Sequence, residues 1–116
     1  MILKLDHVQR LNLHALLGAQ RGDVATIRAV WALQDKVALT ADEETAIGLQ
    51  QSVVGGQERV VWNPEAPLQP REFEFSDVDL ARLKAAVETW ANYAATVDRR
   101  WLEPLVAAVF PSGVGA

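Results

Sequence analysis

The sequence predicts an α+β fold, a mostly helical single domain with a small antiparallel sheet of two or three strands. Apolar residues recur at helical spacing up to residue 48 and again after residue 76. Between these regions, two valine-rich runs flank Gly55-Gly56, which is typical of a β-hairpin. The segment "REFEFS" alternates phenylalanine with glutamate and predicts a further strand.

A capping residue begins each of the first three predicted helices. Asp6 caps a helix that ends near Gly18, and Asp23 caps the next one. Thr40 and Glu43 have the Thr-x-x-Glu spacing of a capping box, which begins a short third helix. The expected apolar faces consist of Val8, Leu11, Ala15 and Leu16 in the first helix and of Val24, Ile27, Val30, Trp31 and Val37 in the second.

The tripeptide Arg21-Gly22-Asp23 is read by adhesion receptors in some extracellular proteins. Here it separates two predicted helices, and no extracellular signal accompanies it. We interpret it as a connection in which Gly22 turns the chain and Asp23 caps the second helix.

Ser76 is the predicted cap of one long helix near the C-terminus. Apolar residues follow it in steps of three and four, which makes a heptad-like stripe. The stripe consists of Leu80, Leu83, Val87, Trp90, Ala94, Val97 and Trp101. Packing against the rest of the domain and a homodimer seam both explain it. Pro104 either kinks this helix or begins a short terminal one.

The expected order is therefore helix, helix, helix, hairpin, strand, long helix and short helix. These elements form one globular domain over residues 1–110, and residues 111–116 form a flexible C-terminal tail. Between hairpin and strand, Pro64, Pro67 and Pro70 recur every third residue. Such spacing favours polyproline II, either as a stiff surface connection or as a ligand for an aromatic groove.

Composition narrows the classes of function. The 116 residues include no cysteine, and their net charge is -4, which disfavours nucleic acid as a partner. No secretory signal or membrane span is recognisable, so we expect a soluble cytoplasmic protein. His7 and His14 stand seven residues apart, too far along a helix to share a metal ion. We expect no metal, no cofactor and no catalytic set, hence no enzyme.

Several segments together resemble small uncharacterised proteins of bacteriophages and prophages. They are the leucine-rich first helix, "TIRAVWALQDKVALTADEE", "VVWN" and "EFEFSDVDLARLKAAV" with the short helix after it. The resemblance covers roughly residues 5–110 and implies an origin in a phage genome with a role inside the infected bacterium. It implies no reaction and no functional residues.

We expect a small, non-enzymatic protein-binding protein, an inhibitor or adaptor that acts on a host or phage protein. Aromatic and arginine side chains dominate protein interfaces, so the candidate contact residues are Trp62, Tyr93, Arg99, Arg100 and Trp101. One alternative is a virion structural or assembly protein that forms a homo-oligomer. Another is a winged-helix-like DNA-binding regulator, although its recognition helix would be the acidic "ADEETAIGLQQ".

Overall fold

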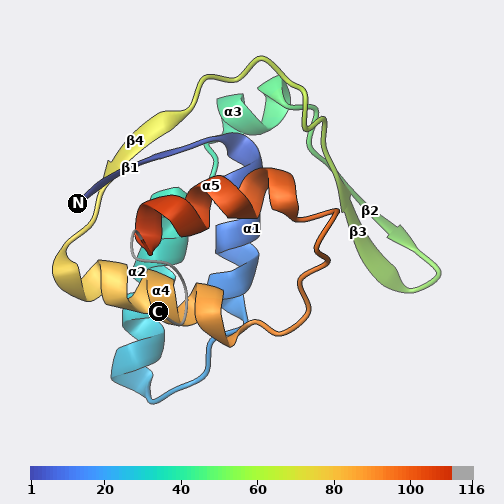
Figure 1. Ribbon diagram of the computed structural model, residues 1–116. Helices are drawn as coiled ribbons and strands as arrows, with labels where there is room; N and C mark the ends of the chain where they lie inside the picture. The colour runs from blue at the N-terminus through green and yellow to red at the C-terminus, as the bar shows by residue number, and fades with distance from the viewer. Residues whose placement is uncertain (111–116) are drawn as a thin grey trace.

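The computed structural model describes residues 1–110 of the chain (Figure 1). The predicted tail over residues 111–116 lies outside this part. In chain order the elements are β1 (Ile2–Leu5), α1 (His7–Gly18), α2 (Val24–Val37), α3 (Ala41–Ala46), β2 (Gln50–Val54), β3 (Gln57–Val61), β4 (Arg71–Glu74), α4 (Asp77–Thr89) and α5 (Arg99–Val109). The predicted α+β class is confirmed.

The predicted helix caps are confirmed. The carboxylates of Asp6 and Asp23 each accept a hydrogen bond of 2.8 Å from a backbone N–H three residues later. Thr40 and Glu43 form both halves of a capping box. Ser76 caps α4. Asp23 is thus the N-cap of α2 in the connection between α1 and α2, as the sequence indicates.

The strands form two separate two-stranded sheets. The predicted hairpin is β2–β3, and its turn uses Gly55 and Gly56, both with positive φ. β4, the predicted strand with alternating phenylalanines, pairs with β1 instead of with the hairpin. β1 was not predicted, because its four residues are too few to establish an alternating pattern beside exposed Ile2.

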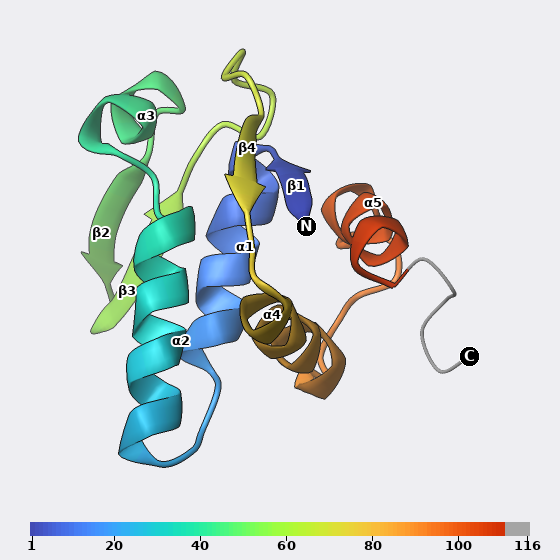
Figure 2. The ribbon, with the colours of Figure 1, turned by 90° about the vertical axis from the view of Figure 1, so that its left-hand side faces the viewer.

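α1 is the central helix of the domain. It contacts α2, α4 and α5, and the β1–β4 sheet lies close to its N-terminal end (Figure 2). The side chains of Phe73, in β4, and of Phe75, just after it, lie in the same core as the buried leucines of α1. The hairpin stands apart from this body, and every residue of β2 is exposed.

The predicted apolar faces of α1 and α2 need correction. α2 buries Val30, Leu33 and Val37, whereas Val24 and Trp31 are exposed. α1 buries a face that includes Leu13 and Leu17. Of the face predicted for α1, only Leu16 is buried, whereas Val8 and Leu11 are half-buried and Ala15 is exposed.

The predicted long helix does not exist as one element. α4 ends at Thr89, because Trp90 takes an extended conformation with ψ of 124°, and α5 begins at Arg99. The break lets α5 fold back and bury Trp101, Leu105 and Val109 in the core, which a straight helix would carry away from it. A homodimer seam along one helix from Leu80 to Trp101 is therefore wrong. Pro104 lies inside α5 and begins no helix of its own.

None of the helices formed by residues 1–110 combines the length and the apolar character that crossing a membrane requires.

Candidate protein-binding surface

α1 carries apolar residues on two faces, and the core covers one of them. Leu13, Leu16 and Leu17 face the core. Leu11 and Ala15 lie on the other side of the helix, where they border an open hollow. Val8 packs against the edge of the core and borders a second hollow. α1 packs against three other helices, and the apolar residues that these neighbours leave uncovered are available to another molecule. The second face of α1 therefore marks this side of the molecule as a candidate binding surface.

A buried ion pair fixes the position of α1. Arg10 is 1% exposed, and its guanidinium makes two hydrogen bonds to the Glu43 carboxylate, of 2.5 and 3.0 Å. The same guanidinium donates to the carbonyls of Val37 and Ala38 at the end of α2. The hydrogen bonds from Arg10 lower the pKa of Glu43 to about 2. The predicted capping acid thus also ties α3 to α1 and α2.

The first hollow lies between α1, the base of β3 and the segment before α5. We call it the aromatic hollow, and it has a volume of about 440 Å³. Val8 and Asn12 contribute from α1, while Trp62 and Pro64 stand on one side and Val97 and Trp101 on the other. Val97 is 78% exposed, so its side chain is accessible to a molecule that enters the hollow.

Two of the five predicted contact residues, Trp62 and Trp101, line this hollow, and Tyr93 packs next to it. Trp62 is half-buried and Trp101 is 6% exposed, so Trp101 is a core residue that also borders the hollow. Tyr93 packs against Trp101 with a centroid distance of 6.1 Å and lines a smaller hollow next to it. The structure therefore brings together residues that are widely spaced in the sequence.

Tyr93 and Asp98 hold the segment between α4 and α5 in place. The Tyr93 hydroxyl donates to the Val87 carbonyl at 2.8 Å, and burial, with a smaller effect from Asp98, raises the pKa of Tyr93 to about 12. The Asp98 carboxylate accepts hydrogen bonds from the Trp101 indole at 3.0 Å and from the Ala94 backbone at 2.7 Å. Tyr93 is therefore a neutral packing residue at physiological pH.

The two predicted arginines lie beside the hollow without lining it. Arg99 pairs with Glu103 one turn later on α5, at 2.5 Å. Arg100 pairs with Glu65 in the proline-containing loop. Each of these hydrogen bonds raises the pKa of the arginine, and Arg100 also lowers the pKa of Glu65. Both pairs are exposed, so they remain accessible to a partner's charges.

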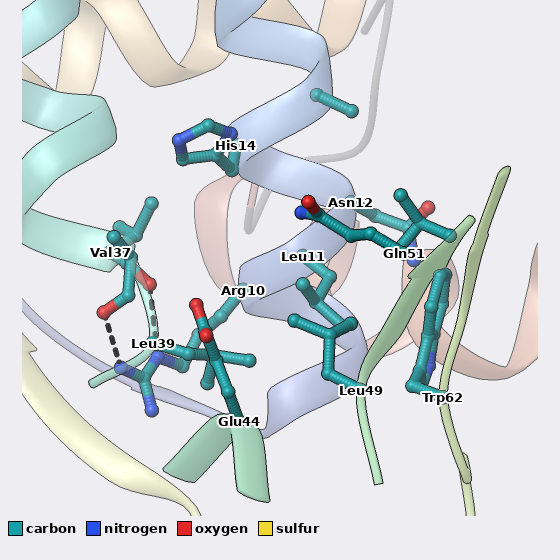
Figure 3. Close-up of a pocket in the computed structure, with 13 residues that line it drawn as sticks. Arg10, Leu11, Asn12, His14, Val37, Leu39, Glu44, Leu49, Gln51 and Trp62 are labelled. Atoms are coloured by element: carbon teal, nitrogen blue, oxygen red, sulfur yellow. Dashed lines mark hydrogen bonds between the residues drawn. The ribbon is translucent and has the colours of Figure 1, made fainter. Parts of the chain in front are cut away.

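The second hollow lies on the other side of the hairpin base, and we call it the edge groove (Figure 3). Its volume is about 340 Å³. Leu11 and Ala15 of α1 and Leu39 form its apolar part, while Leu49 and Gln51 line it from the start of β2. Val60 and Trp62 border both hollows. The hairpin base therefore separates two cavities that share the second face of α1.

The histidines do not form a site together. His7 is buried, and its Nε2 lies 3.0 Å from the Asn63 carbonyl, which ties the start of α1 to the end of β3. His14 is exposed at the rim of the edge groove. Within residues 1–110, no three histidine or acidic side chains are grouped in a way that would hold a metal ion.

The region expected to act as a recognition helix is short and acidic. α3 has six residues, and Asp42, Glu43 and Glu44 occupy its first turn. Carboxylates at this position repel a phosphate backbone. The hairpin beside it pairs only with itself in the described part of the chain, because β1 belongs to the other sheet.

Two residues that line the aromatic hollow or the smaller hollow next to it were not predicted as contact residues. Val97 and Trp90 were assigned to the stripe of a long helix, yet both are exposed, and they line neighbouring hollows. The sequence does contain a signal for the break between α4 and α5, because Asn92 and Thr96 are poor helix formers.

No protein-family model, no curated protein and no solved structure matches this chain.

Proposed function

We propose that this chain is a small, non-enzymatic protein-binding protein, an inhibitor or adaptor that holds an apolar segment of its partner in the aromatic hollow. The observation that carries the proposal is the open hollow beside α1, which Trp62 and Val97 border from two different segments. A partner's apolar side chain in this hollow would remove both of them from water.

The chemistry of the hollow suits a protein ligand. Apolar and aromatic side chains supply its walls, and Asn12 and Asp98 supply the polar groups. Burial of apolar surface contributes about 25 cal/mol per Å². Tryptophan and arginine are frequent at the energetic centres of interfaces. Trp62 lines the hollow, and exposed Arg99 and Arg100 follow its lining residue Asp98 on α5, which matches the composition of a binding surface.

The partner class follows from the resemblance to small bacteriophage proteins. It would be a host or phage protein in the cytoplasm of the infected bacterium. The net charge of -4 favours association with a basic surface, since complementary charges speed the encounter of two proteins. The exposed acids of α3 add to this field.

A selection from displayed random peptides tests the proposal with the purified chain as bait. The binding of a selected peptide is then titrated against two variants, Val97→Lys in the hollow and Val78→Lys on α4. Both valines are largely exposed, at 78% and 64%, so neither lysine disturbs the core. We expect Val97→Lys to lower the affinity for the peptide at least tenfold, because the substitution places a charge in the hollow. Val78→Lys should leave this affinity unchanged. Equal affinity for both variants, or no selected peptide, would overturn the proposal.

A further inference from the structure

We propose that the chain forms a symmetric dimer in which the β2 strands of two copies pair antiparallel along their free edges. This goes beyond the proposed function, because it assigns the edge groove, and not the aromatic hollow, to a second copy of the chain. The inference rests on the hydrogen-bonding pattern of the hairpin, on the residues of β2 and on the isolation of the hairpin from the body.

The hairpin pattern determines which backbone groups of β2 face outward. Val54 and Gln57 flank the two-residue turn, whose glycines have φ of 60° and 80°. In such a hairpin the residues that flank the turn form a hydrogen-bonded pair, and pairs then alternate along the ladder. Ser52 therefore directs its N–H and C=O toward β3, while Gln51 and Val53 direct theirs to the free edge.

Those outward groups have no backbone partner elsewhere in residues 1–110. The hydrogen bonds outside the regular ladders join neither Gln51 nor Val53 to another segment. All five residues of β2 are exposed. A strand edge with unpaired N–H and C=O groups is a template for another strand.

β2 also lacks the devices with which proteins protect such an edge. Its sequence, "QQSVV", contains no charge and no proline. β3, by contrast, carries the charged side chain of Arg59. Charged residues and prolines on an edge strand prevent further pairing. Two β2 strands can meet without placing like charges opposite each other, so this edge accepts a second copy of itself.

Pairing with a second copy would stabilise the hairpin, which is otherwise only two strands wide. A two-stranded hairpin is marginal in water, and three or more strands are needed for independent stability. Here the hairpin is joined to the body near its base, where the Asn63 N–H donates to the Ile47 carbonyl at 2.9 Å. Pairing of two β2 strands would build one four-stranded sheet from two exposed hairpins.

The outward groups define the register of the dimer. Gln51 of one copy lies opposite Val53 of the second copy as a hydrogen-bonded pair, and the reverse pair is identical by symmetry. The twofold axis then passes between the two Ser52 residues, which face each other as a non-hydrogen-bonded pair. This isologous arrangement closes the dimer and leaves no further β2 edge free.

The same register completes the edge groove. Gln51 pairs with Val60 across the hairpin, so both side chains lie on the face that borders the groove. Residues opposite each other in a ladder share a face. Gln51 lines the groove (Figure 3), so Val53 of the second copy would arrive beside it at the edge of the groove. The apolar residues Leu11 and Leu49 receive cover that the single chain does not supply.

A single-cysteine variant tests the register directly, because the chain contains no cysteine. Non-hydrogen-bonded pairs have Cα atoms about 4.5 Å apart, within the range of a disulfide. We expect Ser52→Cys to become a covalent dimer under mild oxidation. The matched control is Val54→Cys, whose copies would lie more than about 10 Å apart in this register. Equal cross-linking of both variants would overturn the proposed pairing.

A second variant tests the dimer without covalent chemistry. Ser52 pairs with Arg59 inside the hairpin, so Ser52→Glu adds a favourable charge pair within each copy and two facing carboxylates between copies. By light scattering we expect a dimer for the parent chain and a monomer for Ser52→Glu at the same concentration. Circular dichroism reports whether the variant is folded. A parent chain that is monomeric up to high micromolar concentration, or a dimer unaffected by Ser52→Glu, would refute the inference.

Discussion

Replacing Glu43 with glutamine is expected to destabilise the chain in a pH-dependent manner. Glu43 is 13% exposed and makes a two-point contact with the buried guanidinium of Arg10. Glutamine keeps the size of the side chain and resembles the protonated carboxyl, so the variant isolates the effect of the negative charge. The pair joins α1 to α3, and its loss affects the whole domain.

The pKa of Glu43 gives the magnitude and the sign. Arg10 lowers this pKa from 4.5 to about 2, so the folded state binds the proton less tightly than the unfolded state does. The stabilisation is complete above the unfolded pKa and is lost as the pH falls toward 2. Lowering the pKa by this amount corresponds to about 3 kcal/mol at pH 7 and to about 1.4 kcal/mol at pH 3.

Urea unfolding, followed by tryptophan fluorescence at several pH values between 3 and 7, measures the difference between the parent and Glu43→Gln. Glu44→Gln is the control, since Glu44 is the exposed neighbour in the same turn of α3. We expect the control to change the free energy of unfolding by less than about 0.5 kcal/mol. If Glu43→Gln costs no more than the control, or the same amount at every pH, the assigned role of the ion pair is wrong.

Two further substitutions test the core and the hairpin. Phe75→Ala removes a side chain that is 1% exposed, and we expect a loss of about 3 to 5 kcal/mol in urea unfolding, against less than about 0.5 kcal/mol for exposed Val24→Ala. Gly56→Ala forces a residue with a Cβ into φ of 80°, so the amide groups of the hairpin should exchange faster with solvent. Gly55→Asn, which suits the same type of turn, should leave their exchange rates unchanged.

Local signals in the sequence correctly predicted where α1, α2, α3 and α4 begin. A side-chain cap such as Asp23 or Ser76 acts within three residues, so its partner is visible in the sequence itself. The glycine pair of the hairpin is equally local. These features form between residues that are close in the sequence, and tertiary contacts did not override them.

The arrangement of the elements was less predictable, because it depends on contacts between distant residues. The stripe that ends at Trp101 has helical spacing across the break at Trp90, so the apolar pattern does not show where α4 ends and α5 begins, whereas the docking of α5 on α1 does. The burial of Arg10 shows the same limitation. An arginine is rarely buried, and its partner Glu43 follows 33 residues later.

The candidate surface depends on the same tertiary contact between Arg10 and Glu43. Because the Arg10 side of α1 turns inward to meet Glu43, the helix rotates Leu11 and Ala15 away from the core. A chain that buries a charged residue and leaves apolar ones uncovered sacrifices stability in isolation. That cost is offset if the uncovered side chains are buried against another molecule, which is what the two proposed interfaces accomplish.

The two interfaces depend on one structural element, the base of the hairpin. Val60 and Trp62 border both hollows, so their positions affect the aromatic hollow and the edge groove together. A hairpin of two strands moves relative to the body more readily than a sheet of four. Pairing of β2 with a second copy would thus reduce the motion of Trp62 and lower the entropic cost of binding a segment in the aromatic hollow. On this reasoning dimerisation and partner binding favour each other, although they use opposite sides of the hairpin.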